Sequence, residues 1–331
     1  MTTLLTPPET TVTAPQQLQL MVRSLAVAAD RVLTIELEAP GREELPEWQP
    51  GAHVDVILRD GVVRQYSLCG DPADRRRWRL GVLREDIGRG GSEYVHAVLR
   101  PGDAVQVRGP RNHFPMVPAG HYLFIAGGIG ITPILPMVAQ VHRQGGSYRL
   151  VYGGRSRSSM AFLDELERYG ENVTLVPQDE LGLPDIAGLI ASAPAGTNVY
   201  CCGPEPLIAA VERATEGLPP GALHRERFAA APTDPDAEPQ PAGDAFEVEL
   251  ASSGEVLTVA PDQSVLEALE VAGVPILSSC REGICGTCET GVISGKPDHR
   301  DSLLSDEEKE ESATMLVCVS RACSPRLVLD L

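Results

Sequence analysis

The sequence predicts a multidomain protein that combines an antiparallel β-barrel, an α/β domain with a parallel sheet, and a small α+β domain. Three observations predict this arrangement: short even strands in the first third, strands alternating with helices in the middle, and a compact cysteine-bearing unit after a proline-rich segment. A chain of 331 residues is long enough for two or three domains, each with its own core. We expect a disordered tail at 1–15, the barrel at 16–118, the α/β domain at 119–228, a linker at 229–245 and the α+β domain at 246–331.

The first unit is an even series of short strands. Its apolar runs alternate with polar residues and are interrupted by Gly, Pro and Asp: LQLMVRSLAVA, VLTIELEA, HVDVIL, WRLGVL and AVQVRG. This pattern is typical of an antiparallel barrel or sandwich.

One strand of this unit, RQYSL at 64–68, carries side chains suited to a ligand. Alternation along a strand places Arg64, Tyr66 and Leu68 on one face and Ser67 on the other. Together they offer a positive charge for a phosphate, a ring for stacking and a hydroxyl. An ordinary edge strand is the alternative interpretation.

A glycine-rich turn, GRGGS at 88–92, follows further along the first unit. It precedes the helical run YVHAVL, so we expect Ser92 to be the N-cap of a helix whose free N–H groups can hold a phosphate. The alternative is a flexible loop capped by Ser92.

The middle unit alternates strands and helices. The strands are YLFIAGG, YRLVYGG, NVTLVP and NVYCCGP, and the helices are ITPILPMVAQVHRQ and SMAFLDELERYG. This order predicts a parallel sheet with its ligand crevice beyond the carboxyl ends of the strands.

Two turns lie at those strand ends. The turn from Gly127 to Pro133 has the spacing G-x-G-x-x-P and therefore lacks the third glycine of the usual dinucleotide fingerprint. Pro133 suits the start of a helix, and Thr132 is placed to cap that helix or to contact a phosphate. At the second turn, Cys202 offers a polarisable thiol as a candidate contact for a nicotinamide ring.

The last unit begins with FEVELASSGEVLTV, which predicts a hairpin, and SVLEALEVAG, which predicts a helix. Its cysteine loop reads SCREGICGTCE, and two strands, MLVCVSRA and RLVLDL, close the chain. Four cysteines with the spacing C-x4-C-x2-C and one distant member form a motif: Cys280, Cys285, Cys288 and Cys318.

This spacing is typical of the ligands of a plant-type two-iron, two-sulfur cluster, and thiolates are the soft ligands that such a cluster needs. Gly283 and Gly286 would let backbone amides approach the sulfur atoms. A structural zinc site is the less favoured alternative, because only Cys285 and Cys288 form the C-x2-C pair that zinc prefers.

The remaining cysteines fit a reducing compartment. The chain opens MTTLLTPPETT, without the basic start and apolar run of a signal peptide, so we expect a cytoplasmic protein rather than a disulfide framework. We expect Cys69, Cys201 and Cys323 to be small buried residues.

Charge and hydropathy exclude two classes of partner. A net charge of −18 argues against nucleic acid, whose binding depends on Lys and Arg, and no apolar run approaches the roughly 20 residues that span a membrane. Residues 245–331 hold 16 acidic against 6 basic residues. This excess serves either solubility or the steering of a basic electron-transfer partner.

Taken in order, these motifs resemble the phthalate dioxygenase reductase family, which includes the reductases of vanillate demethylase and related oxygenases. The resemblance runs from about Gln17 to Leu331 and rests on RQYSL, GRGGS, GGIGITP, VYCCGP, the four cysteines and the ending MLVCVSRA…LVLDL. It implies a flavin-binding barrel, a nicotinamide-binding α/β domain and a plant-type ferredoxin domain. Because the ferredoxin domain comes last, the resemblance implies FMN rather than FAD.

The implied function is that of a reductase component. NADH gives hydride to FMN, and electrons then pass singly through the cluster to a terminal oxygenase of the Rieske type. A cytochrome P450 or another monooxygenase is the alternative partner. Two different functions also stay open: a redox sensor without catalytic activity, and a simple flavin reductase with a structural zinc. Since one chain holds every carrier, we expect a monomer.

The resemblance also implies roles for individual residues. Ser67 would lie near the ring edge that accepts hydride, Phe228 would cover the flavin ring, and Arg155 would lie near the cofactor ribose, where the neighbouring Arg157 leaves NADPH open beside NADH. The other implied flavin contacts are Arg64, Tyr66, Val82, Leu83, Arg84, Gly90, Gly91, Ser92 and Thr132. The other implied nicotinamide contacts are Gly128, Gly130, Cys202, Gly203 and Pro204.

Overall fold

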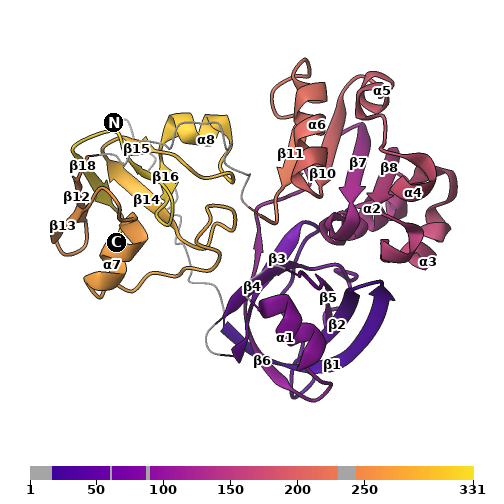
Figure 1. Ribbon diagram of the computed structural model, residues 1–331, viewed down its shortest axis with the longest axis horizontal. Coiled ribbons are helices and arrows are strands. Elements are labelled where there is room, and N and C mark those ends of the chain that lie inside the picture. The colour runs from indigo at the N-terminus through magenta and orange to yellow at the C-terminus, as the bar shows by residue number, and fades with distance from the viewer. Residues whose placement is uncertain (1–16, 60–61, 87–89, 230–243) are drawn as a thin grey trace, which may run out of the picture.

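The computed structural model describes residues 17–59, 62–86, 90–229 and 244–331. The expected tail at 1–15, most of the expected linker and two residues of the glycine-rich turn, Gly88 and Arg89, lie outside the described residues. Figure 1 shows three bodies: a barrel, an α/β domain beside it, and a C-terminal domain on the other side.

The first body is a six-stranded antiparallel sheet that closes on itself. Its strand order is β4-β3-β6-β1-β2-β5, and an isolated bridge between Leu68 and Leu80 joins the two ends. The predicted antiparallel barrel is therefore confirmed. Its elements are β1 Gln17–Ala29, β2 Val32–Glu38, β3 Ala52–Ile57, β4 Val63–Ser67, β5 Trp78–Leu83, α1 Gly91–Ala97 and β6 Ala104–Asn112.

The start of α1 differs from the prediction. Gly90 is the N-cap residue, with a left-handed φ of 78°, and Ser92 lies inside the helix. The prediction of Ser92 as the N-cap was wrong because glycine supplies the turn itself, without a side-chain cap. The hydroxyl of Ser92 instead accepts a hydrogen bond from the backbone N–H of Glu85 at 3.2 Å.

The second body is the predicted parallel sheet, with strand order β11-β10-β7-β8-β9. The helix expected over 159–170 is shorter, because the chain tightens into 3-10 turns and bends at Gly170, where φ is 53°. The elements are β7 His121–Gly127, α2 Ile131–Arg143, β8 Tyr148–Gly154, α3 Leu163–Leu166, β9 Val173–Pro177, α4 Gln178–Leu181, α5 Ile186–Ala191, β10 Thr197–Cys202, α6 Glu205–Thr215 and β11 Leu223–Glu226.

One hydrophobic cluster spans the barrel and the α/β domain, beside the separate core of the barrel. Val32, Cys69 and Phe114 of the barrel pack in the same buried cluster as Phe124 and Tyr200 of the parallel sheet. Because apolar burial is the dominant stabilising term in folding, these two bodies form one continuous unit.

A part-buried ion pair adds to the contact between the barrel and the α/β domain. Arg79 in β5 contacts both carboxylate oxygens of Glu165 in α3, and it also donates to the carbonyl oxygen of Cys69 at 2.7 Å. This bidentate contact fixes the relative orientation of the two bodies.

The C-terminal body has its own core, made of residues from 246 onward. The predicted hairpin and helix are confirmed, and Ser264 caps the helix in a capping box with Glu267. Its elements are β12 Phe246–Leu250, β13 Val256–Val259, α7 Val265–Val271, β14 Glu289–Ser294, β15 Pro297–Asp298, α8 Asp306–Glu311, β16 Thr314–Leu316, β17 Arg321–Ala322 and β18 Arg326–Leu329.

Cys318 and Cys323, near the end of the chain, differ from the predicted strand and the predicted burial. Cys318 lies in the turn between β16 and β17 rather than within a strand. Cys323 is exposed, so its assignment as a buried hydrophobic residue was wrong, whereas Cys69 and Cys201 are buried as expected. In the part of the chain that the structure describes, no helix is long and apolar enough to cross a membrane.

Candidate functional site

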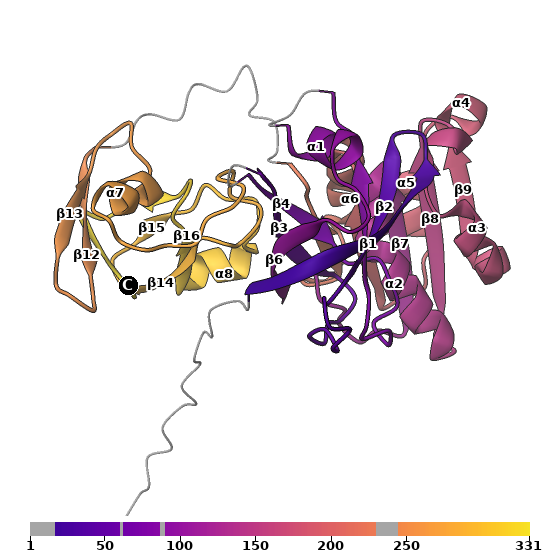
Figure 2. The same ribbon diagram turned by 90° about the horizontal axis from the view of Figure 1, so that it is seen from below.

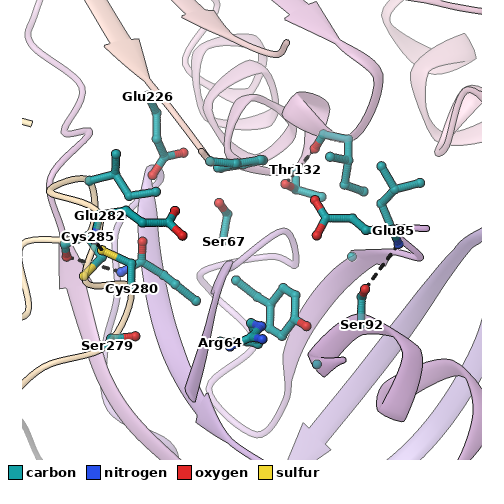
Figure 3. Close-up of a pocket in the computed structure, with 18 residues that line it drawn as sticks. Arg64, Ser67, Glu85, Ser92, Thr132, Glu226, Ser279, Cys280, Glu282 and Cys285 are labelled. Atoms are coloured by element: carbon teal, nitrogen blue, oxygen red, sulfur yellow. Dashed lines mark hydrogen bonds between the residues drawn. The ribbon is translucent and has the colours of Figure 1, made fainter. Parts of the chain in front are cut away.

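One cavity is lined by all three bodies (Figure 3). It encloses about 1040 Å³, including the open solvent at its mouth. Strand β4 and the start of α1 form one side, the turn before α2 and the end of β11 form another, and the cysteine loop of the C-terminal body closes the third. Such a junction between domains is where proteins commonly bind cofactors.

Strand β4 contributes four consecutive residues, Arg64, Gln65, Tyr66 and Ser67. Ser67 was expected on the face opposite Arg64 and Tyr66, yet all three residues line the cavity. Tyr66 Oη and Ser67 Oγ are buried without a hydrogen-bond partner among the described residues, and burial raises the pKa of Tyr66. Buried polar atoms on a cavity wall are groups that a bound flavin can satisfy.

The turn before α2 and the first residues of α2 reach the barrel at Gly81. Thr132 is buried, and its hydroxyl donates to the carbonyl oxygen of Ile129 at 2.9 Å. Its methyl carbon lies 2.7 Å from the point where a Cβ on Gly81 would stand. Only glycine at position 81 lets this turn line the same cavity as β4, a requirement that sequence patterns did not indicate.

Glu226, at the end of β11, points its carboxyl group into the cavity (Figure 3). Its Oε2 atom is buried and makes no hydrogen bond to a described residue. Burial raises the pKa of Glu226 to about 8. The facing Ser67 hydroxyl lowers this pKa and so offsets part of the rise. Sequence reasoning missed Glu226, because a glutamate within LHRERF has the appearance of a surface charge.

The four motif cysteines converge in the C-terminal body. A hydrogen bond from Cys280 lowers the pKa of Cys285, and one from Cys288 lowers that of Cys318, so the thiols form two pairs. The charge of Cys285 raises the pKa of both Cys288 and Cys318, so the two pairs lie close together.

The backbone around these sulfur atoms suits a cluster. The N–H of Glu282 donates to Cys280 Sγ at 3.3 Å, and Cys285 Sγ contacts Thr287 Oγ1 at 3.2 Å. Gly283 has a φ of 70°, and a Cβ there would stand 2.6 Å from a methyl carbon of Val319. Donors aimed at converging thiolates, on a loop that only glycine permits, are what an iron-sulfur cluster needs.

Two family models match parts of this chain. Residues 248–323 match the family described as the 2Fe-2S iron-sulfur cluster binding domain, and residues 124–181 match the oxidoreductase NAD-binding domain. The chain is 45% identical to the phenoxybenzoate dioxygenase subunit beta of Ectopseudomonas oleovorans, over 94% of this chain and 97% of that protein.

The solved structure of phthalate dioxygenase reductase, described as a modular structure for electron transfer from pyridine nucleotides to [2Fe-2S], is 37% identical. It superposes with a TM-score of 0.69, over 95% of this chain and 98% of its own. This chain belongs to the phthalate dioxygenase reductase family. An intact type IV self-sufficient cytochrome P450 monooxygenase is also similar to this reductase, with 45% identity and a TM-score of 0.89 over 95% of this chain, which spans 41% of that one.

Among the expected flavin contacts of the reductase, seven line the cavity: Arg64, Tyr66, Ser67, Leu83, Gly91, Ser92 and Thr132. Phe228 also lines it and is 44% exposed at its mouth. Val82, Arg84 and Gly90 lie beside these residues in the chain but do not line the cavity. Cys280 and Cys285 reach the cavity wall, whereas Cys288 and Cys318 are buried in the ferredoxin core.

The expected nicotinamide contacts lie at the ends of β7 and β10. Cys202 is fully buried, and burial raises the pKa of its thiol, with the charge of Glu226 adding to the effect. A Cβ on Gly130 would stand 2.2 Å from the carbonyl oxygen of Cys202, so the two strand ends pack directly together. Gly128, with a φ of 52° and open space around it, is the member of this turn that faces outward. Gly203 and Pro204 follow Cys202 and lead into α6.

Proposed function

We propose that this reductase binds FMN in the three-sided cavity, receives hydride from NADH and delivers single electrons through a 2Fe-2S cluster to a Rieske-type oxygenase. One observation carries the proposal: the cavity wall combines flavin-type residues of the barrel, the turn before α2, and the ligand residues Cys280 and Cys285. The proposed flavin and cluster sites share one cavity wall, and the α/β domain reaches the same wall at Ile129 and Thr132, which supports short-range electron transfer.

When bound, a flavin accepts two electrons as hydride and releases them singly, and a two-iron cluster passes one electron at a time. The residues of the cavity wall are placed to hold the flavin. Arg64 and Ser92 lie where a phosphate would sit, with the Arg64 side chain packed against Gly91. The Ser67 hydroxyl and the Glu226 carboxyl face the centre of the cavity, where they can hydrogen-bond ring atoms (Figure 3). Phe228 lines the cavity and is partly exposed, which supports the proposal that it would cover the flavin ring until the nicotinamide displaces it.

The preference for NADH is supported by the surroundings of the RSRSS turn. Arg157 Nε is bound to both carboxylate oxygens of Glu180, at 2.9 and 3.1 Å, so its charge is already compensated. The exposed Arg155 lies nearby. The Glu180 carboxylate, beside the RSRSS turn, would accept a hydrogen bond from a ribose hydroxyl and repel a 2′-phosphate.

The partner and location are proposed on chemical grounds. The similar dioxygenase subunit supports an oxygenase as the electron acceptor, and the similar self-sufficient P450 makes a cytochrome P450 the second candidate. A single chain carries every site, which supports a monomer. None of the described cysteines forms a disulfide, which supports a reducing cytoplasm.

Replacement of one ligand tests the proposed order of electron flow. Cys285→Ser should leave the reduction of bound flavin by NADH fast and abolish the reduction of cytochrome c, because electrons reach the flavin before the cluster. Cys323→Ser, which changes an exposed cysteine outside the motif, is the matched control and should retain both activities. Equal loss of both reactions in Cys285→Ser would contradict the proposed order.

A further inference from the structure

The ferredoxin domain lies beside the barrel, on the side of β3, β4 and β6 (Figure 2). Consecutive residues of its cysteine loop contact the barrel. Arg111 Nη2, in β6, donates to Thr287 Oγ1 at 3.1 Å. The preceding residue, Gly286, lies against His113, since a Cβ on this glycine would stand 2.6 Å from His113 Nε2. The loop therefore meets the barrel at the two positions between the ligands Cys285 and Cys288.

A third contact comes from the flavin strand. Gln65 Nε2, in β4, donates to the carbonyl oxygen of Cys285 at 3.3 Å. Gln65 and Cys285 both line the cavity, so this hydrogen bond joins its barrel wall to its cluster wall. The ferredoxin core itself contains only its own residues, so specific contacts of this kind determine how the domain is docked.

Arg111 is held in place from inside the barrel. The same Nη2 atom lies 2.8 Å from Oδ1 of Asp55 in β3, whose side chain is 0% exposed. Arg111 Nε and Nη1 are buried and have no hydrogen-bond partner among the described residues. A buried ion pair with unsatisfied donors contributes little net stability, because desolvation offsets the attraction. Its orientation, fixed by Asp55, is the feature that needs an explanation.

The hydrogen-bonding chemistry of Arg111 and Thr287 explains why the orientation of Arg111 matters. Arginine only donates hydrogen bonds, so its N–H occupies a lone pair of Thr287 Oγ1 and leaves the single hydroxyl proton for another acceptor. Cys285 Sγ lies 3.2 Å from this oxygen and can serve as that acceptor. When this sulfur is a deprotonated ligand, the hydroxyl donates to it, and the arginine strengthens that bond by polarising the oxygen.

We propose that Arg111 is a positioning residue for electron transfer, which docks the cluster loop on the barrel and directs the Thr287 hydroxyl toward the sulfur of Cys285. This inference rests on the proposed cluster site. A hydrogen bond to a ligand sulfur stabilises the more negative, reduced state of a cluster and so raises its reduction potential. Asp55 compensates the charge of Arg111, so the effect is exerted through the hydroxyl rather than through a bare positive charge.

Four variants of the full-length reductase test the proposal. Thr287→Val removes both hydrogen bonds at nearly constant volume, and Thr287→Ser retains them. Asp55→Leu combined with Arg111→Met removes the ion pair without leaving a buried charge. Thr290→Val is the matched control, because the Thr290 hydroxyl donates to the carbonyl oxygen of the ligand Cys288 rather than to a sulfur atom.

The readouts are the midpoint potential of the cluster, by spectroelectrochemical titration, and the amide hydrogen exchange of residues 283–288. Thr287→Val should shift the equilibrium between oxidised and reduced cluster about tenfold toward the oxidised form, which for one electron is about 59 mV. The double variant should shift it in the same direction and accelerate exchange of the loop about tenfold. Thr287→Ser and Thr290→Val should match the parent protein.

An unchanged potential in Thr287→Val, with the cluster bound, would overturn the proposal, as would an unchanged loop exchange in the double variant. An equal shift in Thr290→Val would also overturn it, because the effect would then be general to the loop. The visible spectrum of each sample separates these results from failure of the proposed function. Absence of cluster absorbance in the parent protein would contradict the cluster site itself.

Discussion

Glu226→Gln should remove part of the pH dependence of the free energy of unfolding of the cofactor-free protein. Burial raises the pKa of Glu226 from 4.5 to about 8, so between these values the folded protein retains a proton that the unfolded chain releases. The free energy of unfolding therefore falls as the pH rises through this interval, and levels off above it. Glutamine cannot titrate and should abolish this part of the decline.

The magnitude follows from the two pKa values. At 1.36 kcal/mol for each pH unit, the difference between 4.5 and about 8 sets a ceiling of about 5 kcal/mol. Glu226 is half-buried, and water at the cavity mouth solvates part of the carboxylate, so we expect about 1–2 kcal/mol. Ser67→Ala should extend the decline to higher pH and enlarge the total loss, because the hydroxyl lowers the pKa of Glu226.

Urea unfolding of the cofactor-free protein at pH 5.5 and pH 8.5 measures this effect. Both tryptophans of the chain, Trp48 and Trp78, are buried in the barrel, so their fluorescence reports the unfolding of the body that faces Glu226. The parent protein should lose about 1–2 kcal/mol more than Glu226→Gln between the two pH values. Identical pH dependence in both proteins would refute the buried-carboxyl argument.

Three further predictions concern the contacts that assemble the molecule. Arg79→Met should lower the free energy of unfolding by about 1–2 kcal/mol, because it removes the bidentate contact to Glu165, which keeps only a 3.9 Å contact to Arg168, and the hydrogen bond to the carbonyl oxygen of Cys69; a loss below about 0.5 kcal/mol in urea titrations would argue against this pair as a link between the domains. Gly283→Ala should reduce cluster absorbance because φ is 70° and the position is crowded, whereas Gly254→Ala, with a φ of 71° and open space, should retain it; equal absorbance in the two would contradict the loop argument. Glu180→Gln should raise the ratio of kcat/KM for NADPH over NADH about tenfold, and an unchanged ratio would exclude this carboxylate from cofactor choice.

The features that sequence predicted well are local in the chain. Alternation over five to seven residues predicts the strands of the barrel, and the order of strands and helices predicts the parallel sheet. The spacing from Cys280 to Cys288 predicts a ligand loop, because consecutive ligands on one turn need fixed intervals. Each of these patterns needs no knowledge of distant contacts.

The features that were missed depend on tertiary contacts. Gly81 is required because Thr132, from another domain, packs against it, and the Oε2 atom of the half-buried Glu226 is buried because the end of β11 faces the cavity. Helix α8 has an acidic sequence without apolar periodicity, so its capping box with Ser305 at the N-cap was its one local signal. Arg111 resembled any charged residue in a strand until its contact with the cysteine loop was known.

The most direct test of the central claim is the visible spectrum of the purified protein before and after anaerobic addition of NADH. A flavin and a 2Fe-2S cluster in one chain should give overlapping absorption bands, and both sets should bleach when NADH is added, because the cavity brings the proposed flavin residues beside Cys280 and Cys285 and against the start of α2. A flavin spectrum without cluster absorbance, together with zinc in metal analysis, would contradict the electron-transfer chain and indicate a simple flavin reductase with a structural metal.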